Sequence, residues 1–322
     1  MLVLSFPHFL LTTLKVDHYF AAIVGVILNT FIVVGLNLKR SNSLGTYRWF
    51  LMAHAGNDLL SAVTMGSIEL CCDYSYGSFM MLINGPTSYF GQRTVYVVFC
   101  IFAASYLLNI LLLALTFVYR KQHLNLFSKP LCMLFIVILM AFPVMLVIVF
   151  SPLAYTYSED FYADTGVNQF NVVLLYVDHV KNPFFITICG TLIGLAMISY
   201  GLVFFCCKAI FAYLNKAKDA LTAKTRKTQR LLTVVLLLQS LTPALTSTFP
   251  GCGLVIALLM QLDIRLVTWI ISGSFVWLPI LNAIITLTFV SPLRSMLLRK
   301  KVEHIGTFSV MKPKTSVLGV VG

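Results

Sequence analysis

The feature that most constrains this chain is a basic segment, Lys208–Arg230, that lies between two long runs without a single charged residue. The runs are Asn182–Cys207 and Leu231–Gln261. Each exceeds the roughly 20 apolar residues that an α-helix needs to cross a bilayer. Lys and Arg in short loops beside such spans concentrate on the cytoplasmic side. We therefore expect two membrane-spanning helices joined by a cytoplasmic loop, and this loop sets the side of every other loop.

Five further apolar stretches extend the pattern along the chain. The seven expected spans are His18–Leu38, Tyr47–Cys71, Arg93–Val118, Leu131–Phe150, Pro183–Cys207, Leu231–Met260 and Leu266–Val290. Because backbone groups in lipid must be satisfied within the segment, each span is expected to be helical. The sequence therefore predicts an all-α membrane protein, in which residues 18–290 form a seven-transmembrane helix bundle.

The distribution of basic residues gives the orientation of this bundle. Of the 23 Lys and Arg residues, 19 fall in the odd-numbered loops and the tail, on the side of the Lys208–Arg230 segment. The other side holds Lys15, Arg93, Lys181 and Arg265. We therefore expect an extracellular N-terminus, residues 1–17, and a cytoplasmic tail, residues 291–322.

The composition excludes several other classes of protein. Only 11% of the 322 residues are charged and 59% are hydrophobic, whereas soluble domains are about 25% charged. The net charge of +12 lies in short segments between apolar runs, where it sets topology, so no nucleic-acid partner is expected. The histidines are scattered and no Gly-rich phosphate loop follows a strand, so we expect no enzyme, cofactor or metal cluster.

Seven helices with the N-terminus outside is the layout of G-protein-coupled receptors, and some transporters and pumps share it. An ion pathway usually carries several charges within the membrane, whereas only Asp58 and Glu69 lie inside the expected spans. The chain also lacks a clear internal repeat of the kind found in many transporters. These observations favour a receptor, with a membrane transporter or ligand-gated channel as the alternative.

Four stretches resemble the nematode serpentine chemoreceptors of the Str superfamily. Ser41–Leu60 (SNSLGTYRWFLMAHAGNDLL) resembles their first inner loop and second helix, and Phe117–Leu124 (FVYRKQHL) resembles the Tyr-Arg end of their third helix. Thr228–Gly251 (TQRLLTVVLLLQSLTPALTSTFPG) is similar to their sixth helix, with its recurring Gln and Pro. Phe289–Lys300 (FVSPLRSMLLRK) resembles their Pro-Tyr-Arg ending, although Leu293 stands where Tyr is usual.

The resemblance implies a chemosensory receptor in the plasma membrane of a ciliated sensory neuron. Such a receptor binds a small organic odorant or pheromone and couples to a heterotrimeric G protein. The residues placed by resemblance and charge at the coupling surface are Tyr119, Arg120, Lys224, Arg226, Lys227 and Arg230. The same basic residues also suit a simpler role as anchors for anionic membrane lipids. The common signatures of rhodopsin-like receptors are missing, because the 151–182 loop lacks cysteine and the seventh helix lacks Asn-Pro-x-x-Tyr.

A ligand pocket is expected in the outer half of the bundle. Tyr96, Phe99, Cys100 and Ala103 share one face of the third helix by their i, i+3, i+4, i+7 spacing. An aromatic rim above small residues suits a small apolar ligand. Glu69 lies about one turn from the outer end of its helix, where it can meet a polar group of a ligand or interfacial water. Ordinary helix packing is the alternative explanation for the third-helix residues.

Four polar residues lie ten to twelve residues from a cytoplasmic basic residue of their own span, namely Asn29, Asp58, Asn109 and Asn282. At 1.5 Å of rise per residue this is about 15–18 Å, near the midplane of a hydrocarbon core about 30 Å thick. Polar groups in lipid seek partners. The sequence therefore predicts one buried cluster around Asp58, with waters or a sodium ion as candidate members. This cluster either couples the outer, ligand-binding half of the bundle to its cytoplasmic half during activation, or only holds the helices together.

Overall fold

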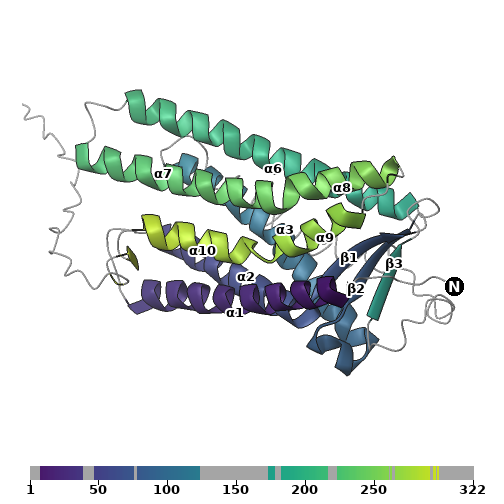
Figure 1. Cartoon of the computed structure of the whole chain (residues 1–322). Helices are drawn as coiled ribbons and strands as arrows, with labels where there is room; N and C mark the ends of the chain where they lie inside the picture. Colours follow the sequence, from purple (N-terminus) through teal and green to yellow (C-terminus); the bar gives the residue numbers. More distant parts are fainter. Residues whose placement is uncertain are drawn as a thin grey trace, which may run out of the picture.

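The structure is a computed structural model that describes residues 8–38, 47–75, 78–123, 173–177, 183–216, 223–260, 262, 265–290, 293–294 and 296. The predicted fourth span, Leu131–Phe150, and nearly all of the predicted tail lie outside these residues. The other six predicted spans are helical, and the helices run beside one another along the molecule (Figure 1).

The longer helices have the following bounds: α1 His8–Leu38, α2 Tyr47–Ile68, α3 Gln92–His123, α6 Pro183–Lys216 and α7 Ala223–Pro243. The last two predicted spans are divided into shorter elements, which are the π turn η3 Ala244–Thr248, α8 Phe249–Leu259, α9 Arg265–Phe275 and α10 Leu278–Phe289. Several helices extend beyond their predicted spans. The first begins at His8 rather than His18, and α6 continues to Lys216 rather than ending at Cys207.

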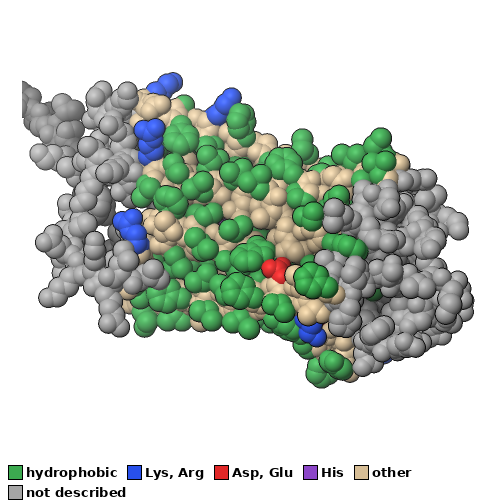
Figure 2. Space-filling view, viewed as in Figure 1, with side chains coloured by type: hydrophobic (Ala, Val, Ile, Leu, Met, Phe, Trp, Pro, Cys, Tyr) green, Lys and Arg blue, Asp and Glu red, His purple; other side chains and the backbone are tan. Residues whose placement is uncertain are grey.

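Three helices in the described part of the chain are long and apolar enough to cross a membrane, over Thr12–Leu38, Arg93–Tyr119 and Ile193–Lys216. Val267–Phe275 and Leu278–Phe289 form a fourth candidate span if the two pieces, bent by 44°, are counted together. Apolar side chains cover the flank of the bundle (Figure 2). Large residues such as Ile27 of α1 and Phe204 of α6 are more than half exposed, which is the pattern expected of a surface that faces lipid.

A three-stranded sheet at one end of the bundle was not predicted. Strands β1 (Leu70–Ser75), β2 (Ser78–Ile83) and β3 (Val173–Val177) pair antiparallel in that order. The second span was predicted to continue to Cys71, but α2 ends at Ile68 because Glu69 adopts a φ of +44° that no helix accommodates. We call this end of the molecule the sheet end, and the opposite end, where α1 and α3 finish and α7 begins, the basic end.

The sheet is attached to the helices through its first strand. The amide N–H of Cys72 donates to the hydroxyl of Ser272 on α9 over 2.8 Å. The imidazole of His18 on α1 lies between two backbone carbonyls, with Nδ1 2.7 Å from the Leu14 oxygen and Nε2 3.2 Å from the Leu70 oxygen. These contacts pair backbone groups of β1 with side chains of α1 and α9, and they hold the strand against the two helices.

Proline explains why the last two spans are divided. Pro243 ends the regular part of α7, and the five residues after it form the π turn. Pro279 lies in the first turn of α10, directly after the break at Val276–Trp277. A proline has no N–H to donate and its ring clashes with the preceding turn, so a helix kinks or restarts there.

Small residues bring α1 and α2 close together. A Cβ atom at Gly66 would lie only 2.6 Å from the Cβ of Ala22, and one at Gly25 would lie 3.1 Å from the Cβ of Ala62. Such small residues allow two membrane helices to pack at short range, which is a main source of stability when lipid surrounds the bundle.

We predict that Gly66→Ala destabilises the protein, because the added methyl group overlaps Ala22 and overpacking costs about 1–3 kcal/mol. Gly56→Ala is the matched control on the same helix, since a Cβ there would meet nothing within 4 Å. Thermal unfolding of the detergent-solubilised protein measures both variants. Equal unfolding temperatures for the two would contradict the close approach of α1 and α2.

Candidate functional site

Asp58 is the centre of the buried polar cluster. Its carboxylate is only 2% exposed, and its Oδ1 atom accepts hydrogen bonds from two other helices. Asn109 Nδ2 of α3 donates over 2.6 Å and Asn282 Nδ2 of α10 donates over 3.3 Å. The structure thus brings together three of the four residues that the depth argument singled out.

Asn29 is the fourth of these residues and does not bond to Asp58. It is buried on α1, and its Nδ2 atom donates to two backbone carbonyls, those of Gly25 at 2.9 Å and Pro279 at 3.2 Å. Because Pro279 stands at the beginning of α10, Asn29 ties α1 to the break between α9 and α10. This contact depends on the helix break, which the depth argument did not include.

The amide groups around Asp58 use their nitrogens and leave their oxygens unpaired. The Oδ1 atoms of Asn29, Asn109 and Asn282 are buried without a hydrogen-bond partner, and so is Oε1 of Gln239. Gln239 on α7 donates through Nε2 to the Thr286 hydroxyl over 2.8 Å. The Thr286 hydroxyl in turn donates to the backbone carbonyl of Asn282 over 2.8 Å. A carboxylate surrounded by acceptors is an environment that suits waters or a hard cation such as sodium.

A row of polar residues continues along α2 and joins it to α3. His54 Nε2 lies 3.1 Å from the Thr116 hydroxyl, Asn57 Nδ2 donates to the Ser105 carbonyl at 2.8 Å, and the Ser61 and Ser105 hydroxyls are 2.7 Å apart. The sequence analysis overlooked this row. Its signal was present as polar residues recurring every three or four positions on an otherwise apolar span.

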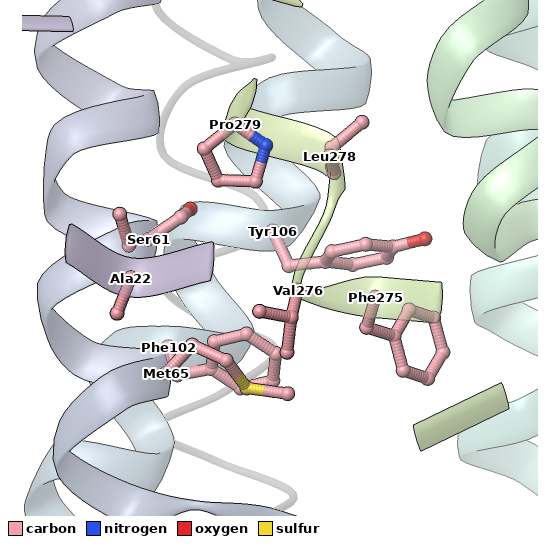
Figure 3. Close-up of a pocket in the computed structure, with 10 residues that line it drawn as sticks. Ala22, Ser61, Met65, Phe102, Tyr106, Phe275, Val276, Leu278 and Pro279 are labelled. Carbon is pink, nitrogen blue, oxygen red and sulfur yellow. The ribbon is translucent and has the colours of Figure 1, made fainter. Parts of the chain in front are cut away.

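A small cavity lies one helical turn from the Asp58 cluster, on the side of the sheet end. Figure 3 shows the residues that line it. Its volume of about 10 Å³ leaves room for about one water molecule. It is lined by Ala22, Ser61, Ala62, Met65, Phe102, Tyr106, Phe275, Val276, Leu278 and Pro279. The walls therefore come from α1, α2, α3 and the break between α9 and α10, and they are mostly apolar.

The residues predicted to line a pocket on α3 lie beside this cavity rather than around it. Phe99 is buried in the hydrophobic core near the sheet end, where Tyr96 packs at its edge. Cys100 and Ala103 are half-buried. Phe102 and Tyr106 line the cavity instead, so the face of α3 that meets it is rotated slightly from the predicted one. Glu69 is buried outside the cavity lining, at the end of α2.

Tyr106 connects the cavity to the π turn. In Figure 3 its ring stands at the cavity wall while its hydroxyl points away from Ser61 and Ala22. The ring packs edge-to-face on Phe275, with centroids 5.7 Å apart. The hydroxyl lies near enough to the side chains of Ser247 and Thr248 in the π turn to interact with them electrostatically. Tyr106 therefore lies between the cavity and this turn.

Two other helices also hold the π turn. The Tyr200 hydroxyl of α6 lies 3.2 Å from that of Thr248. The Ser274 hydroxyl of α9 lies 2.8 Å from the Thr246 carbonyl and 2.9 Å from the Ile271 carbonyl of its own helix, and its single proton is shared between these two acceptors. Pro250 has no N–H, so in a regular helix this carbonyl, four residues earlier, would lack its donor. The Ser274 hydroxyl offers this carbonyl a donor from a neighbouring helix.

The predicted coupling residues lie at the basic end. Tyr119 packs against Phe50 of α2 with ring centroids 4.6 Å apart, and Arg120 follows it in the last turns of α3. Lys224, Arg226 and Lys227 lie in the first turns of α7, where Arg230 is exposed. Figure 2 shows that the described Lys and Arg side chains in view gather mainly at this end.

Long apolar helices, a polar cluster buried at mid-length and a basic end together define a multi-pass helical membrane protein. The family described as serpentine type 7TM GPCR chemoreceptor Srd matches residues 14–299, which is most of the chain. The protein therefore belongs to this nematode chemoreceptor family. The predicted seven-transmembrane class and the resemblance to the Str superfamily are confirmed, and the match adds the subfamily. Curated protein sequences give no match.

We predict that Asp58→Asn folds and reaches the cell surface but signals with altered potency or altered basal activity. The substitution keeps the shape and an acceptor oxygen for Asn109 and Asn282 while it removes the charge. Coupling between sites is typically 1–3 kcal/mol, so we expect a change of roughly five-fold or more. Surface labelling and G-protein nucleotide exchange, each with and without sodium, measure the effect. If Asp58→Asn signals like the wild type and neither protein responds to sodium, the cluster has only a static, structural role.

Proposed function

We propose that this protein is a chemosensory receptor that binds a small organic odorant or pheromone within the helix bundle and activates a heterotrimeric G protein. The observation that carries the proposal is the contact of Tyr106 with both the cavity and the π turn of the sixth span. Through this residue, a molecule bound between the helices acts on α7, which leads to the basic end. The Srd family membership supports the same reading.

The ligand proposed for the cavity is small and mostly apolar. Only about one water fits between the walls as they stand, so a ligand binds by moving flexible side chains such as Met65, Phe102 and Phe275. The hydroxyls of Ser61 and Tyr106 are the polar groups at its edge. A ligand with one polar atom and a compact apolar body suits these walls.

Activation is proposed to pass through the π turn. Single π turns are uncommon in helices and often mark functional sites. A ligand that displaces the Tyr106 ring removes its hydroxyl from Ser247 and Thr248. Tyr200 and Ser274 then no longer suffice to hold the turn in its present form, and α7 shifts relative to α3. The Asp58 cluster, which contacts α7 through Gln239 and Thr286, changes its pairing at the same time.

The partners are proposed from the two ends of the bundle. Arg120 and the basic start of α7 form the surface for the G protein, and exposed basic residues such as Arg230 also meet anionic lipid headgroups. A sodium ion or waters among the amide oxygens around Asp58 stabilise the resting state. The plasma membrane and the sensory cilium, with the N-terminus outside, are proposed from the family resemblance and the distribution of basic residues.

A transporter or ligand-gated channel is the second candidate, and the broken α9–α10 span favours it. Transporters often bind their substrates at discontinuous helices near the midplane, and the Asp58 cluster lies beside such a break. The two candidates differ in the readout of a ligand screen. Ligand-dependent uptake or current without any G protein would favour the second candidate.

We predict that Ser274→Ala raises ligand-independent nucleotide exchange on a co-purified G protein. Loss of the hydroxyl removes the donor that α9 offers to the part-buried Thr246 carbonyl, and loss of a hydrogen bond costs about 0.5–1.5 kcal/mol, which weakens the present form of the π turn. Ser240→Ala is the matched control, because the Ser240 hydroxyl bonds within its own helix, to the Leu237 carbonyl. Equal exchange rates for wild type and both variants would contradict the proposed route.

A further inference from the structure

Glu69 is held in a strained conformation at the junction of α2 and β1. Its φ of +44° is the only positive value for a residue other than glycine in the described part of the chain. Outside glycine this region is sparsely occupied, and such residues tend to cluster at ligand clamps and switches. The side chain is also only 5% exposed, which is uncommon for a glutamate.

The carboxylate of Glu69 is only partly satisfied. The hydroxyl of Tyr19 on α1 lies near enough to interact with it electrostatically. Its Oε1 atom is buried with no hydrogen-bond partner. Both ring nitrogens of His18 face the carbonyls of Leu14 and Leu70 instead. The Lys15 ammonium lies over the Tyr19 ring, 5.9 Å from its centroid, and leaves Oε1 unoccupied.

A buried carboxylate that lacks a partner favours a positive charge beside it. Removing a carboxylate from water costs several kcal/mol unless a cation or further donors compensate. Tyr19 is the aromatic side chain that interacts with Glu69, and Tyr89 in turn interacts electrostatically with Tyr19. A carboxylate beside tyrosine rings is the combination that recognises an organic ammonium group.

We infer that Glu69 and Tyr19 form a binding site for the ammonium group of a small organic amine. The inference rests on the proposed function in taking this amine as the receptor's ligand. The site lies about one helical turn from the cavity, because Glu69 N–H bonds to the carbonyl of Met65 and Tyr19 precedes Ala22 by three residues. An amine with a short apolar chain spans this distance, with its charge at Glu69 and its chain directed toward the cavity.

The test compares an amine with a neutral molecule of the same shape. Purified full-length receptor in lipid nanodiscs is heated with hexylamine or with hexanol, and the unfolding temperature is followed. Hexylamine is expected to raise the unfolding temperature in a concentration-dependent way, because a ligand that binds only the folded state stabilises it. Hexanol is expected to have a much smaller effect. No shift with hexylamine, or an equal shift with hexanol, would overturn the inference.

Two variants locate the charge that recognises the amine. Glu69→Gln is expected to lose the hexylamine shift. Asp17→Asn is expected to keep it, because Asp17 belongs to the same end of the protein but its Oδ1 already accepts from Trp277 Nε1 at 3.1 Å. Retention of the shift in Glu69→Gln would overturn the inference, and so would a wild-type shift that sodium chloride reproduces.

A third variant covers the case in which Glu69→Gln does not fold. Glu69→Asp keeps the charge but withdraws it by one methylene. The same shift in unfolding temperature is therefore expected to need a several-fold higher hexylamine concentration, and not to vanish. A shift identical to that of the wild type would show that this carboxylate does not touch the amine. Because the measurement needs no G protein, it separates failure of amine binding from failure of coupling.

Discussion

The rest of this structure depends on one buried carboxylate shared by three helices. In lipid, the Asp58 carboxylate is removed from bulk water, so the Asn109 and Asn282 amides that reach Oδ1 become its main partners. These two bonds fix the relative heights of α2, α3 and α10. The cavity one turn away and the break between α9 and α10, to which Asn29 is bonded, are positioned by the same contacts.

Departures from regular helical structure recur along one path through the bundle. Glu69 lies at the sheet end with a positive φ, the π turn after Pro243 lies beside Tyr106, and unpaired amide oxygens surround Asp58. Each departure lowers stability locally, and natural proteins tend to keep such features where function needs them. The path leads toward the basic end, where α3 and α7 carry the proposed coupling residues.

Much of this arrangement was predictable from sequence, because charge positions measure depth in a membrane. The number of residues between each polar side chain and the nearest cytoplasmic charge placed Asp58, Asn109 and Asn282 at one depth, and the structure joins them by hydrogen bonds. It could not show that Asn29 turns to the Pro279 carbonyl, since that contact follows from a helix break. The sheet was missed because its first strand, at Leu70, continues the apolar run of the second span, and only the backbone angle of Glu69 separates them.

A double-mutant cycle between Asn109 and Asn282 tests the central claim most directly. Each single variant, Asn109→Ala or Asn282→Ala, still leaves Asp58 one amide donor. The double variant leaves the buried carboxylate without either amide. The free energy of unfolding of the purified receptor should therefore fall by more in the double variant than the sum of the single losses, with a coupling of about 0.5–3 kcal/mol. Losses that add to within about 0.5 kcal/mol would contradict a shared carboxylate at the centre of the bundle.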